Sequence, residues 1–198
     1  MKKRVFYVLL SLTLISLWSF NVFKTNNSVN IPSKKIYSMG EFVDYGNDFF
    51  DKSIEKRNGY SIKVLYAEVI EFDEFLKQNN ISIQRDKNTF KPKYIYNVRV
   101  IIKNENNTDS GISLLDTTLN SLNDIMQVDF DVFDALYPQL YGAVSFSLKP
   151  KTEMEFQLPF VVANEEFEKI CNYEYLTNKT FYLSLSQYPI EKSIEIHI

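Results

Sequence analysis

The sequence predicts a mainly β protein, an antiparallel β-sandwich with short helices, which follows an N-terminal transmembrane helix. Three observations predict this fold class. Residues 5–23 carry no charged side chain. Several later segments alternate apolar and polar residues with a period of two, as half-buried strands do. The helical segments between them are short and do not alternate regularly with strands, which disfavours a parallel α/β sheet.

The uncharged N-terminal run has the length of a membrane span. A helix of residues 5–23, at about 1.5 Å per residue, extends about 28 Å, close to the roughly 30 Å thickness of the hydrocarbon core. Lys2, Lys3 and Arg4 precede the run, and Trp18 lies near its outer end. The positive-inside rule then places the N-terminus in the cytoplasm and the body outside the cell, as a single-pass protein of the cell membrane.

A cleaved signal peptide is the alternative, and the body would then be secreted. The apolar region of a signal peptide usually has about 7–15 residues and ends at an A-x-A-like site. The run at residues 5–23 is longer, and "SLWSFN" at residues 16–21 offers only poor cleavage sites. We therefore favour an uncleaved signal anchor.

The rest of the chain divides into a stalk and one domain. Residues 24–36 are polar and lack periodicity, which is typical of a short linker. Residues 37–198 fit a single domain, because domains usually have roughly 100–200 residues. The predicted organisation is a signal anchor at residues 1–23, a stalk at 24–36 and an extracytoplasmic β-sandwich at 37–198.

Four predicted strands are read directly from the alternation. In residues 60–72 the side chains expected on one face are Ile62, Val64, Tyr66, Ile70 and Phe72, with Glu68 as the exception. In residues 93–104 they are Tyr94, Tyr96, Val98, Val100 and Ile102, with Asn97, Arg99 and Lys103 opposite. In residues 180–186 and 193–198 they are Phe181, Leu183, Leu185, Ile194, Ile196 and Ile198.

Residues 143–160, "AVSFSLKPKTEMEFQLPF", predict a hairpin. The side chains expected to face the core are Val144, Phe146 and Leu148 before the turn and Met154, Phe156, Leu158 and Phe160 after it. Pro150 suits the second position of a type I turn at residues 149–152. Lys151 in place of glycine disfavours a type II turn, which needs a positive φ at that position.

Three short helices interrupt the strands. The first covers residues 73–78, with Asp73 as a plausible N-cap. The second covers residues 131–137 and stops before Pro138. The third starts at Asn164. The side chains expected to share a buried face are Phe133, Leu136 and Tyr137 in the second helix and Phe167, Ile170 and Cys171 in the third.

Charge excludes nucleic acid as a partner. The whole chain has a formal net charge of −3. Removing Lys2, Lys3 and Arg4 from its 22 basic residues leaves 19 against 25 acidic residues, a net charge of −6 for the body. An acidic body is a poor ligand for polyanions.

The densest group of acids, Asp129, Asp131 and Asp134, raises the possibility of a calcium loop. An EF-hand loop starting at Asp129 would need an oxygen ligand at its fifth position, glycine at its sixth and glutamate at its twelfth. This chain has Phe133, Asp134 and Leu140 there. The simpler interpretation is a group of acids near a helix N-terminus, where the helix dipole favours negative charge.

Nucleophilic catalysis has few candidate residues in this chain. The only histidine, His197, lies on the polar face of the last predicted strand, and the only cysteine, Cys171, lies on an apolar helical stripe. We interpret His197 as solvated and Cys171 as a small core residue. Phosphate-binding and dinucleotide-binding glycine motifs and CxxC are absent from the sequence. We therefore expect no catalytic residue, no metal site and no cofactor. We also expect that the protein is not an enzyme.

Aromatic residues are the one outlier in composition, at 15% of the chain. Exposed tyrosine and phenylalanine side chains are suited to hold a peptide or a glycan. The candidate binding residues are Tyr94, Tyr96, Tyr137, Tyr141 and Tyr188. Packing in a sandwich core explains most of these positions as well, and it remains the alternative.

Segments spread over residues 37–198 also carry a family resemblance, among them "NGYSIKVLYAEVIEFDEFLK", "KPKYIYNVRVIIKNENN" and "FSLKPKTEMEFQLPF". On these segments the chain resembles a family of small exported proteins from Gram-positive bacteria, whose domain is one of unknown function (number five thousand and twenty-eight). The pattern V-x-V-x-I-x-N at residues 98–104 is similar to wider immunoglobulin-like extracytoplasmic domains. The resemblance implies a membrane-tethered, immunoglobulin-like sandwich. It implies no activity and supplies no catalytic residues.

These observations together favour a binding or interaction module at the cell envelope. The expected partners are the membrane, through residues 5–23, and an envelope protein or a peptide, bound for example at a sheet edge. Two alternatives stay open. One is an immunity or accessory factor for an exported peptide system, and the other is a surface hydrolase of wall polymers.

Overall fold

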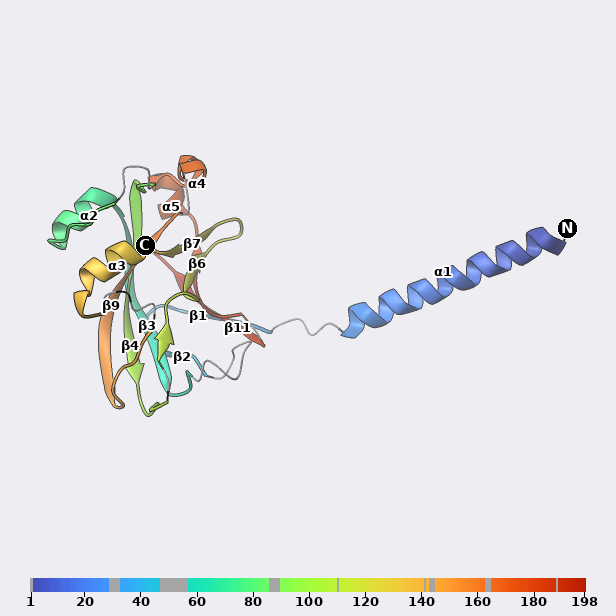
Figure 1. Ribbon diagram of the computed structural model, residues 1–198, viewed down its shortest axis with the longest axis horizontal. Coiled ribbons are helices and arrows are strands. Elements are labelled where there is room, and N and C mark those ends of the chain that lie inside the picture. Colours follow the sequence, from blue (N-terminus) through green and yellow to red (C-terminus); the bar gives the residue numbers. More distant parts are fainter. Residues whose placement is uncertain are drawn as a thin grey trace. The chain divides into compact units, whose positions relative to one another are not determined.

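The computed structural model describes residues 2–28, 33–46, 57–85, 90–109, 111–140, 142, 145–162, 165–187 and 189–198 (Figure 1). The chain divides into two compact units, residues 1–32 and residues 33–198. The first unit contains one helix, and the second, called the body below, contains all of the described strands.

The first unit is the helix α1, Lys2–Ser28. It is long and apolar enough to cross a membrane over Arg4–Ser28, and none of that stretch is buried against protein. The expectation of an N-terminal apolar helix is confirmed. The helix continues five residues beyond the predicted end at residue 23.

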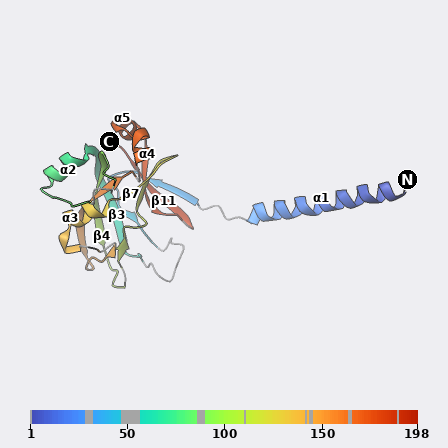
Figure 2. The ribbon, with the colours of Figure 1, turned by 45° about the horizontal axis from the view of Figure 1, so that its top comes forward.

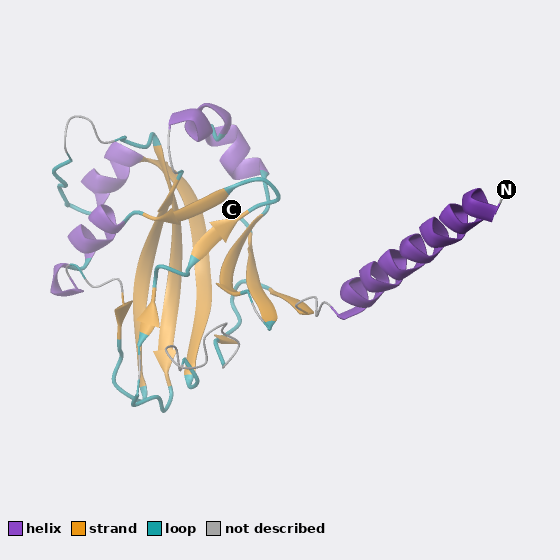
Figure 3. Cartoon of the chain, turned by 45° about the vertical axis from the view of Figure 1, so that its right-hand side comes forward, coloured by secondary structure: helices purple, strands orange, loops and turns teal. Residues whose placement is uncertain are grey.

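The body contains one large sheet (Figure 3, strands in orange). Its nine strands lie in the order β1-β11-β10-β6-β7-β9-β4-β3-β2, and every pair is antiparallel except β1 with β11. The strands are β1 Ser33–Tyr37, β2 Val43–Asp44, β3 Tyr60–Glu71, β4 Tyr94–Asn104, β6 Thr118–Asn120, β7 Ile125–Val128, β9 Thr152–Val161, β10 Phe181–Ser186 and β11 Ile190–Ile196. A separate two-stranded sheet pairs β5, Ile112–Ser113, with β8, Ser145–Phe146.

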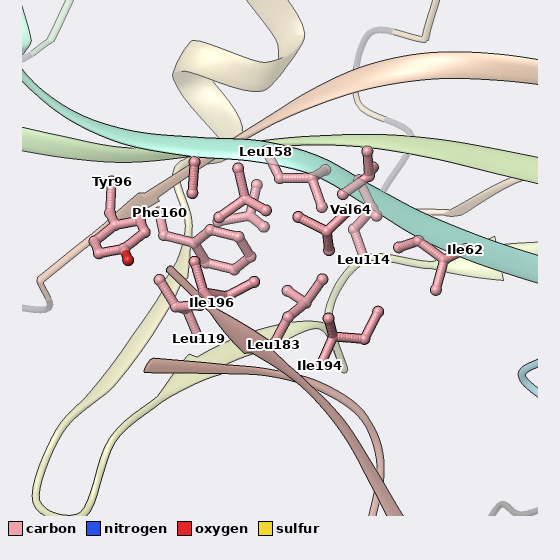
Figure 4. Packing of buried hydrophobic residues seen from close by; sticks show 14 of the residues in the cluster. Ile62, Val64, Tyr96, Leu114, Leu119, Leu158, Phe160, Leu183, Ile194 and Ile196 are labelled. Carbon is pink, nitrogen blue, oxygen red and sulfur yellow. The ribbon is translucent and has the colours of Figure 1, made fainter. Parts of the chain in front are cut away.

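The sheet bends so that its two halves pack face to face around one core (Figure 4). Side chains of β3, β4 and β9 meet those of β6, β10 and β11, and the rings of Tyr96 and Phe181 lie 5.2 Å apart. The labelled residues of this core are Ile62, Val64, Tyr96, Leu114, Leu119, Leu158, Phe160, Leu183, Ile194 and Ile196. The mainly β, antiparallel fold with short helices is therefore confirmed. The two facing layers belong to one continuous sheet, and the immunoglobulin-like label remains unconfirmed.

The far ends of the sheet are linked by a buried lysine. Lys192 on β11 donates hydrogen bonds from Nζ to the carbonyls of Asp44 and Tyr45, at 2.9 and 3.0 Å. Asp44 belongs to β2, which is the last strand at the opposite end of the sheet. Carbonyl acceptors compensate the ammonium group for the water that it loses on burial.

Short helices flank this sheet (Figure 2). They are α2 Phe72–Gln78, α3 Phe130–Leu136, the 3-10 helix η1 Pro138–Leu140, α4 Glu165–Ile170 and α5 Tyr173–Asn178. Cys171 and Leu176, beside and in α5, pack in the main core. On the outer face of the sheet, Phe72 and Phe75 of α2 and Val132 of α3 form a second apolar cluster with Ile95 of β4. Since Tyr96, the next residue, faces the main core, β4 is buried on both faces at this end.

A β-bulge changes the register that the alternation predicts for β3. The pairing with β4 shifts between Val64 and Tyr66, so Ala67 and Val69 face the core. The prediction that Tyr66 and Ile70 face inward is wrong, because one extra residue moves all later side chains to the other face. Glu68 then lies on the outer face and is no exception.

Asn97 lies on the face opposite the core, as predicted, but helices cover that face here. Its side chain is fully buried. It donates hydrogen bonds from Nδ2 to Glu68 Oε1 at 3.0 Å and to Gln157 Oε1 at 3.1 Å. The covering helices make this outer face a second interior, in which buried amides need partners.

The predicted hairpin at residues 143–160 is wrong in its pairing. β9 pairs with β4 and β7, whereas β8 pairs with β5. The turn at residues 149–152 is present, because Thr152 N donates to Lys149 O at 3.2 Å. Lys151 has a φ of 64°. This value fits a type II turn and excludes the predicted type I turn.

Two further boundaries differ from the prediction. The predicted stalk at residues 24–36 contains the end of α1, up to Ser28, and most of β1, which starts at Ser33. In the third predicted helix Cys171 is buried, but Phe167 and Ile170 are exposed by 45% and 60%. The helix α5 was not predicted. The predicted N-cap Asn164 lies outside the described residues.

Phe156 tests the core packing. Its ring is fully buried, and the rings of Tyr137 and Phe146 lie 5.3 and 4.7 Å from it. We expect Phe156→Ala to lower the free energy of unfolding by about 3–5 kcal/mol, because the change leaves a cavity. Urea unfolding of the full chain in mild detergent, followed by tyrosine near-UV circular dichroism, measures this loss. Glu153→Ala, on the exposed side of β9, should change stability by less than about 0.5 kcal/mol. Equal losses for the two variants would contradict the assignment.

Lys151 tests the turn. A non-glycine residue with positive φ costs about 1–2 kcal/mol, and glycine costs about 0.4–1 kcal/mol in unfolded-state entropy. We therefore expect Lys151→Gly to raise the free energy of unfolding by about 0.5–1 kcal/mol in the same assay. Lys149→Gly changes a residue of the same turn whose φ is not positive, so it should destabilise. A loss of stability in Lys151→Gly would show that this backbone conformation is wrong.

Candidate functional site

An exposed apolar surface lies over α4 and α5. We call it the α4–α5 patch, and it consists of Tyr94, Phe167, Ile170 and Tyr173. Phe167, Ile170 and Tyr173 are 45%, 60% and 51% exposed. The ring of half-buried Tyr94 lies 5.8 Å from that of Tyr173. The four side chains thus join the start of β4 to the two helices.

The local sequence explains why these side chains face outward. Phe167 and Ile170 lie three residues apart and so occupy one side of α4. Cys171 N donates to Phe167 O at 2.8 Å, and Asn172 then caps α5 by accepting from Tyr175 N at 2.9 Å. This tight junction turns the Cys171 thiol into the core and leaves the apolar side of α4 in solvent.

Charged groups border the α4–α5 patch. Glu168 accepts a hydrogen bond from the backbone N–H of Lys93, and the Lys93 ammonium lies 5.1 Å from the centre of the Tyr94 ring. Aromatic side chains with a polar rim are the arrangement that protein interfaces favour. The α4–α5 patch therefore combines exposed apolar side chains with a charged border.

A second feature, the Asp124 cluster, consists of Ser121, Asp124, Cys171, Tyr175 and Lys179. The Asp124 carboxylate accepts hydrogen bonds from Ser121 Oγ at 2.8 Å, from Lys179 Nζ at 3.3 Å and from the Tyr175 hydroxyl. The Cys171 thiol lies 4.0 Å from the same carboxylate. Because Tyr175 and Lys179 are four residues apart, the helix α5 and its C-terminal end present both to Asp124.

The electrostatics of the Asp124 cluster keep it charged and unreactive at neutral pH. Burial raises the pKa of Asp124, but the hydrogen bonds from Tyr175, Ser121 and Lys179 outweigh burial, so the pKa is lowered overall. Burial and the nearby Asp124 charge raise the pKa of the Cys171 thiol, which stays protonated. The cluster therefore fixes structure and provides no thiolate nucleophile.

A surface hollow of about 460 Å³ adjoins this cluster, and we call it the hairpin hollow. Its lining residues are Lys34, Asn120, Ser121, Leu122, Asn123, Asp124, Ile125, Tyr182, Glu191 and Ser193. Lys34 forms an ion pair with Glu191 at 3.0 Å and lies 5.6 Å from the centre of the Tyr182 ring. Asn120 Oδ1 accepts no hydrogen bond in the part of the chain that the structure describes. The hollow combines polar walls with an apolar rim at the turn between β6 and β7.

The structure does not gather the five predicted tyrosines into one site. Tyr96 is only 1% exposed and packs in the core, so it cannot contact a ligand at the surface. Tyr137 packs on Phe133 and Phe156, and its hydroxyl accepts from Gln157 N at 2.7 Å. Tyr94 alone joins the α4–α5 patch. Tyr141 and Tyr188 lie outside the described residues.

The other residues considered from the sequence have structural roles. Asp129 caps α3 by accepting from Val132 N at 3.2 Å, and Arg85 pairs with Asp129 and, at 3.6 Å, with Asp131. The interpretation of these acids as groups at a helix N-terminus is confirmed for Asp129 and Asp131, whereas Asp134 lies beyond the first turn of α3 and accepts a hydrogen bond from Gly142 N at 3.0 Å. Among the described residues no group of three or more histidine, cysteine or acidic side chains is placed to hold a metal ion. His197 is exposed, as expected.

Sequence reasoning missed the Asp124 cluster and most of the α4–α5 patch. The cluster joins residues 121–124 to residues 171–179, and no spacing rule connects segments that far apart. Two local signals were available: Asn172 three residues before Tyr175 marks a helix start, and Tyr175 precedes Lys179 by four residues. The patch was missed because the spacing of Phe167 and Ile170 predicts that both lie on the buried face of a helix.

The fold and these surfaces define a class: a mainly β domain that follows an N-terminal apolar helix and carries an exposed aromatic patch. The family model described as "Domain of unknown function (DUF5028)" matches residues 34–192, so the chain belongs to this family and the predicted resemblance is confirmed. The match starts one residue after β1 begins. No curated protein and no solved structure matches the chain.

The Asp124 cluster gives a pH-dependent prediction. We expect Asp124→Asn to destabilise the body by about 1–3 kcal/mol at pH 7, because Lys179 and Tyr175 lose a charged acceptor. The folded pKa of Asp124 is lowered, so its contribution is complete above the ordinary carboxyl pKa of 3.8. It is lost as the pH falls through the folded pKa.

The measurement is urea unfolding of both chains from pH 7 down to the acid range. The difference between wild type and Asp124→Asn should shrink at acid pH. Glu153→Gln, which removes an exposed carboxylate, should show almost no difference at any pH. A difference that stays constant with pH would contradict the charged state of Asp124.

Proposed function

We propose that the chain is a single-pass protein of the cell membrane that holds its β domain outside the cytoplasm. There the domain binds another envelope protein or a peptide through the α4–α5 patch. The observation that carries the proposal is α1, whose apolar side chains have no protein to cover them over Arg4–Ser28. An apolar helix of this length is stable in a bilayer and costly in water.

The orientation follows from charge. Lys2, Lys3 and Arg4 precede the apolar run, and an excess of basic residues is retained on the cytoplasmic side. Lys24 is the first charged residue after the run, and the acidic body follows it. The body is therefore translocated, and α1 remains as an uncleaved signal anchor.

The α4–α5 patch supports a binding role. Large exposed apolar side chains that lie together mark interaction surfaces more often than single exposed ones do. Phe167, Ile170 and Tyr173 are not needed to cover the main core, because Cys171 and Leu176 already face it. The raised pKa of the Cys171 thiol disfavours a thiolate nucleophile at this position.

Membrane anchoring is tested by fractionation and protease protection in intact cells. We expect alkaline carbonate to leave the chain in the membrane, and external protease to digest the body but spare the N-terminal segment. The intact mass of the purified chain reports cleavage. Release by carbonate, a mass that lacks residues 1–23, or a body protected from protease would contradict the proposal.

Partner binding is tested by photo-crosslinking in intact cells. A photoreactive residue at Ile170, on the α4–α5 patch, should form a discrete crosslinked product that is identified by mass spectrometry. The same residue at Lys77, exposed on α2, is the matched control. Tyr173→Asp in the Ile170-labelled chain should abolish the product without lowering the melting temperature, because Tyr173 is exposed. Identical products from both positions would contradict a role for the patch.

A further inference from the structure

The turn between β6 and β7 presents two aliphatic side chains to solvent. Leu122 is 95% exposed, the highest exposure of any large apolar residue described in the body, and Ile125 is 65% exposed. Both line the rim of the hairpin hollow. Ile36 of β1 is 49% exposed and pairs with Ser193, which also lines the hollow. Three apolar side chains therefore stand at or beside one polar hollow.

This exposure is fixed by the fold. Ser121 N donates to Asp124 O at 2.8 Å, and Ser121 Oγ donates to the Asp124 carboxylate at 2.8 Å, so the turn is closed twice. Lys179 and Tyr175 hold the same carboxylate from α5. Leu122 lies between Ser121 and Asp124, the two residues that the hydrogen bonds of the turn join. A leucine that is exposed at a hydrogen-bonded turn marks a surface that contacts an apolar environment.

A short covalent connection allows this turn to reach the membrane surface. α1 ends at Ser28 and β1 starts at Ser33, and five residue steps extend at most about 18 Å. Lys34, the residue after Ser33, lines the same hollow as Leu122 and Ile125. The first residues of the body after this connection therefore line the same hollow as the aliphatic side chains of the turn.

Charge also fits a lipid surface. Lys34 and Lys35 are exposed on β1 directly after the connection to α1, and Lys34 shares this surface with Glu191, its ion-pair partner at 3.0 Å. Basic side chains next to a membrane interface are attracted to anionic headgroups. Aliphatic tips flanked by lysine are the combination that surface-bound membrane segments use.

We propose that the tip of the β6–β7 hairpin docks on the lipid bilayer as a second membrane contact of this protein. Leu122 and Ile125 enter the interface, and Lys34 and Lys35 lie at the headgroups. This inference rests on the proposed membrane anchoring by α1 and adds a defined orientation of the body to it.

The test uses the full chain in vesicles of phosphatidylcholine and phosphatidylglycerol. Asn123→Cys places a thiol at the tip and keeps Leu122 and Ile125 intact. The native Cys171 is 1% exposed, so an environment-sensitive fluorophore reacts at the introduced thiol, and the unsubstituted chain measures residual labelling. Trp18, the only tryptophan, lies in α1 and reports insertion of that helix independently.

We expect the fluorophore at residue 123 to shift its emission to the blue and to be quenched by nitroxide-labelled lipids. The same fluorophore at Lys77→Cys on α2 should stay in water. Adding Leu122→Ser and Ile125→Ser to the Asn123→Cys chain should abolish the shift and the quenching, while its circular dichroism spectrum stays unchanged because both side chains are exposed.

Each outcome separates the two proposals. Quenching of Trp18 without quenching at residue 123 overturns hairpin docking and leaves anchoring intact. Quenching at residue 123 without quenching of Trp18 supports docking and contradicts anchoring by α1. No quenching at either position overturns both. A shift at residue 123 in native membranes but not in pure lipid vesicles identifies a protein as the occupant and overturns lipid docking.

Discussion

The Asp124 carboxylate links the two parts of the body that carry its exposed apolar side chains. Asp124 lies in the turn of the β6–β7 hairpin, whereas Tyr175 and Lys179 come from α5 and its C-terminal end. A buried carboxylate is costly unless donors replace its lost water, and three side-chain donors do so here. If α5 moved away from the hairpin, the Asp124 carboxylate would stay buried but would lose the hydrogen bonds from Tyr175 and Lys179. The hairpin tip and the α4–α5 patch are therefore held in one fixed arrangement.

The bent sheet explains why these surfaces lie where they do. One core fills the space between the two halves of the sheet, and Lys192 links its far ends through the carbonyls of Asp44 and Tyr45. Strand β4 is covered on both faces by the core and by α2 and α3. Turns and helix junctions beyond the strands have no second layer to pack on. Leu122, Ile125 and Ile170 lie at such places and stay 95%, 65% and 60% exposed, so their exposure calls for an explanation outside the fold.

The sequence predicted the strands in which apolar and polar residues alternate with a period of two. It failed where one extra residue changes the register of a strand, or where a distant segment determines the pairing. The strands β3, β4, β9, β10 and β11 each alternate, and the apolar helix α1 is uncharged along residues 5–23. The β-bulge between Val64 and Tyr66 has no sequence signature here, yet it reverses the facing of every later residue in β3. Strand β1 was read as a stalk because its side chains are almost all exposed, and only its pairing with β11 makes it a strand. Of the candidate binding tyrosines, Tyr94 lies in a surface patch. The alternation of apolar and polar residues separates the two faces of a strand, but it does not predict which face a helix covers.

A second membrane contact would change how the body meets its partner. The proposed contact of Leu122 and Ile125 with the bilayer would restrict the orientation of the body relative to the membrane. Because the Asp124 cluster joins the hairpin to α5, fixing the hairpin also fixes the direction of the α4–α5 patch. A partner anchored in the same membrane would then meet the patch in one orientation and at a raised effective concentration, which would strengthen binding without any added contact.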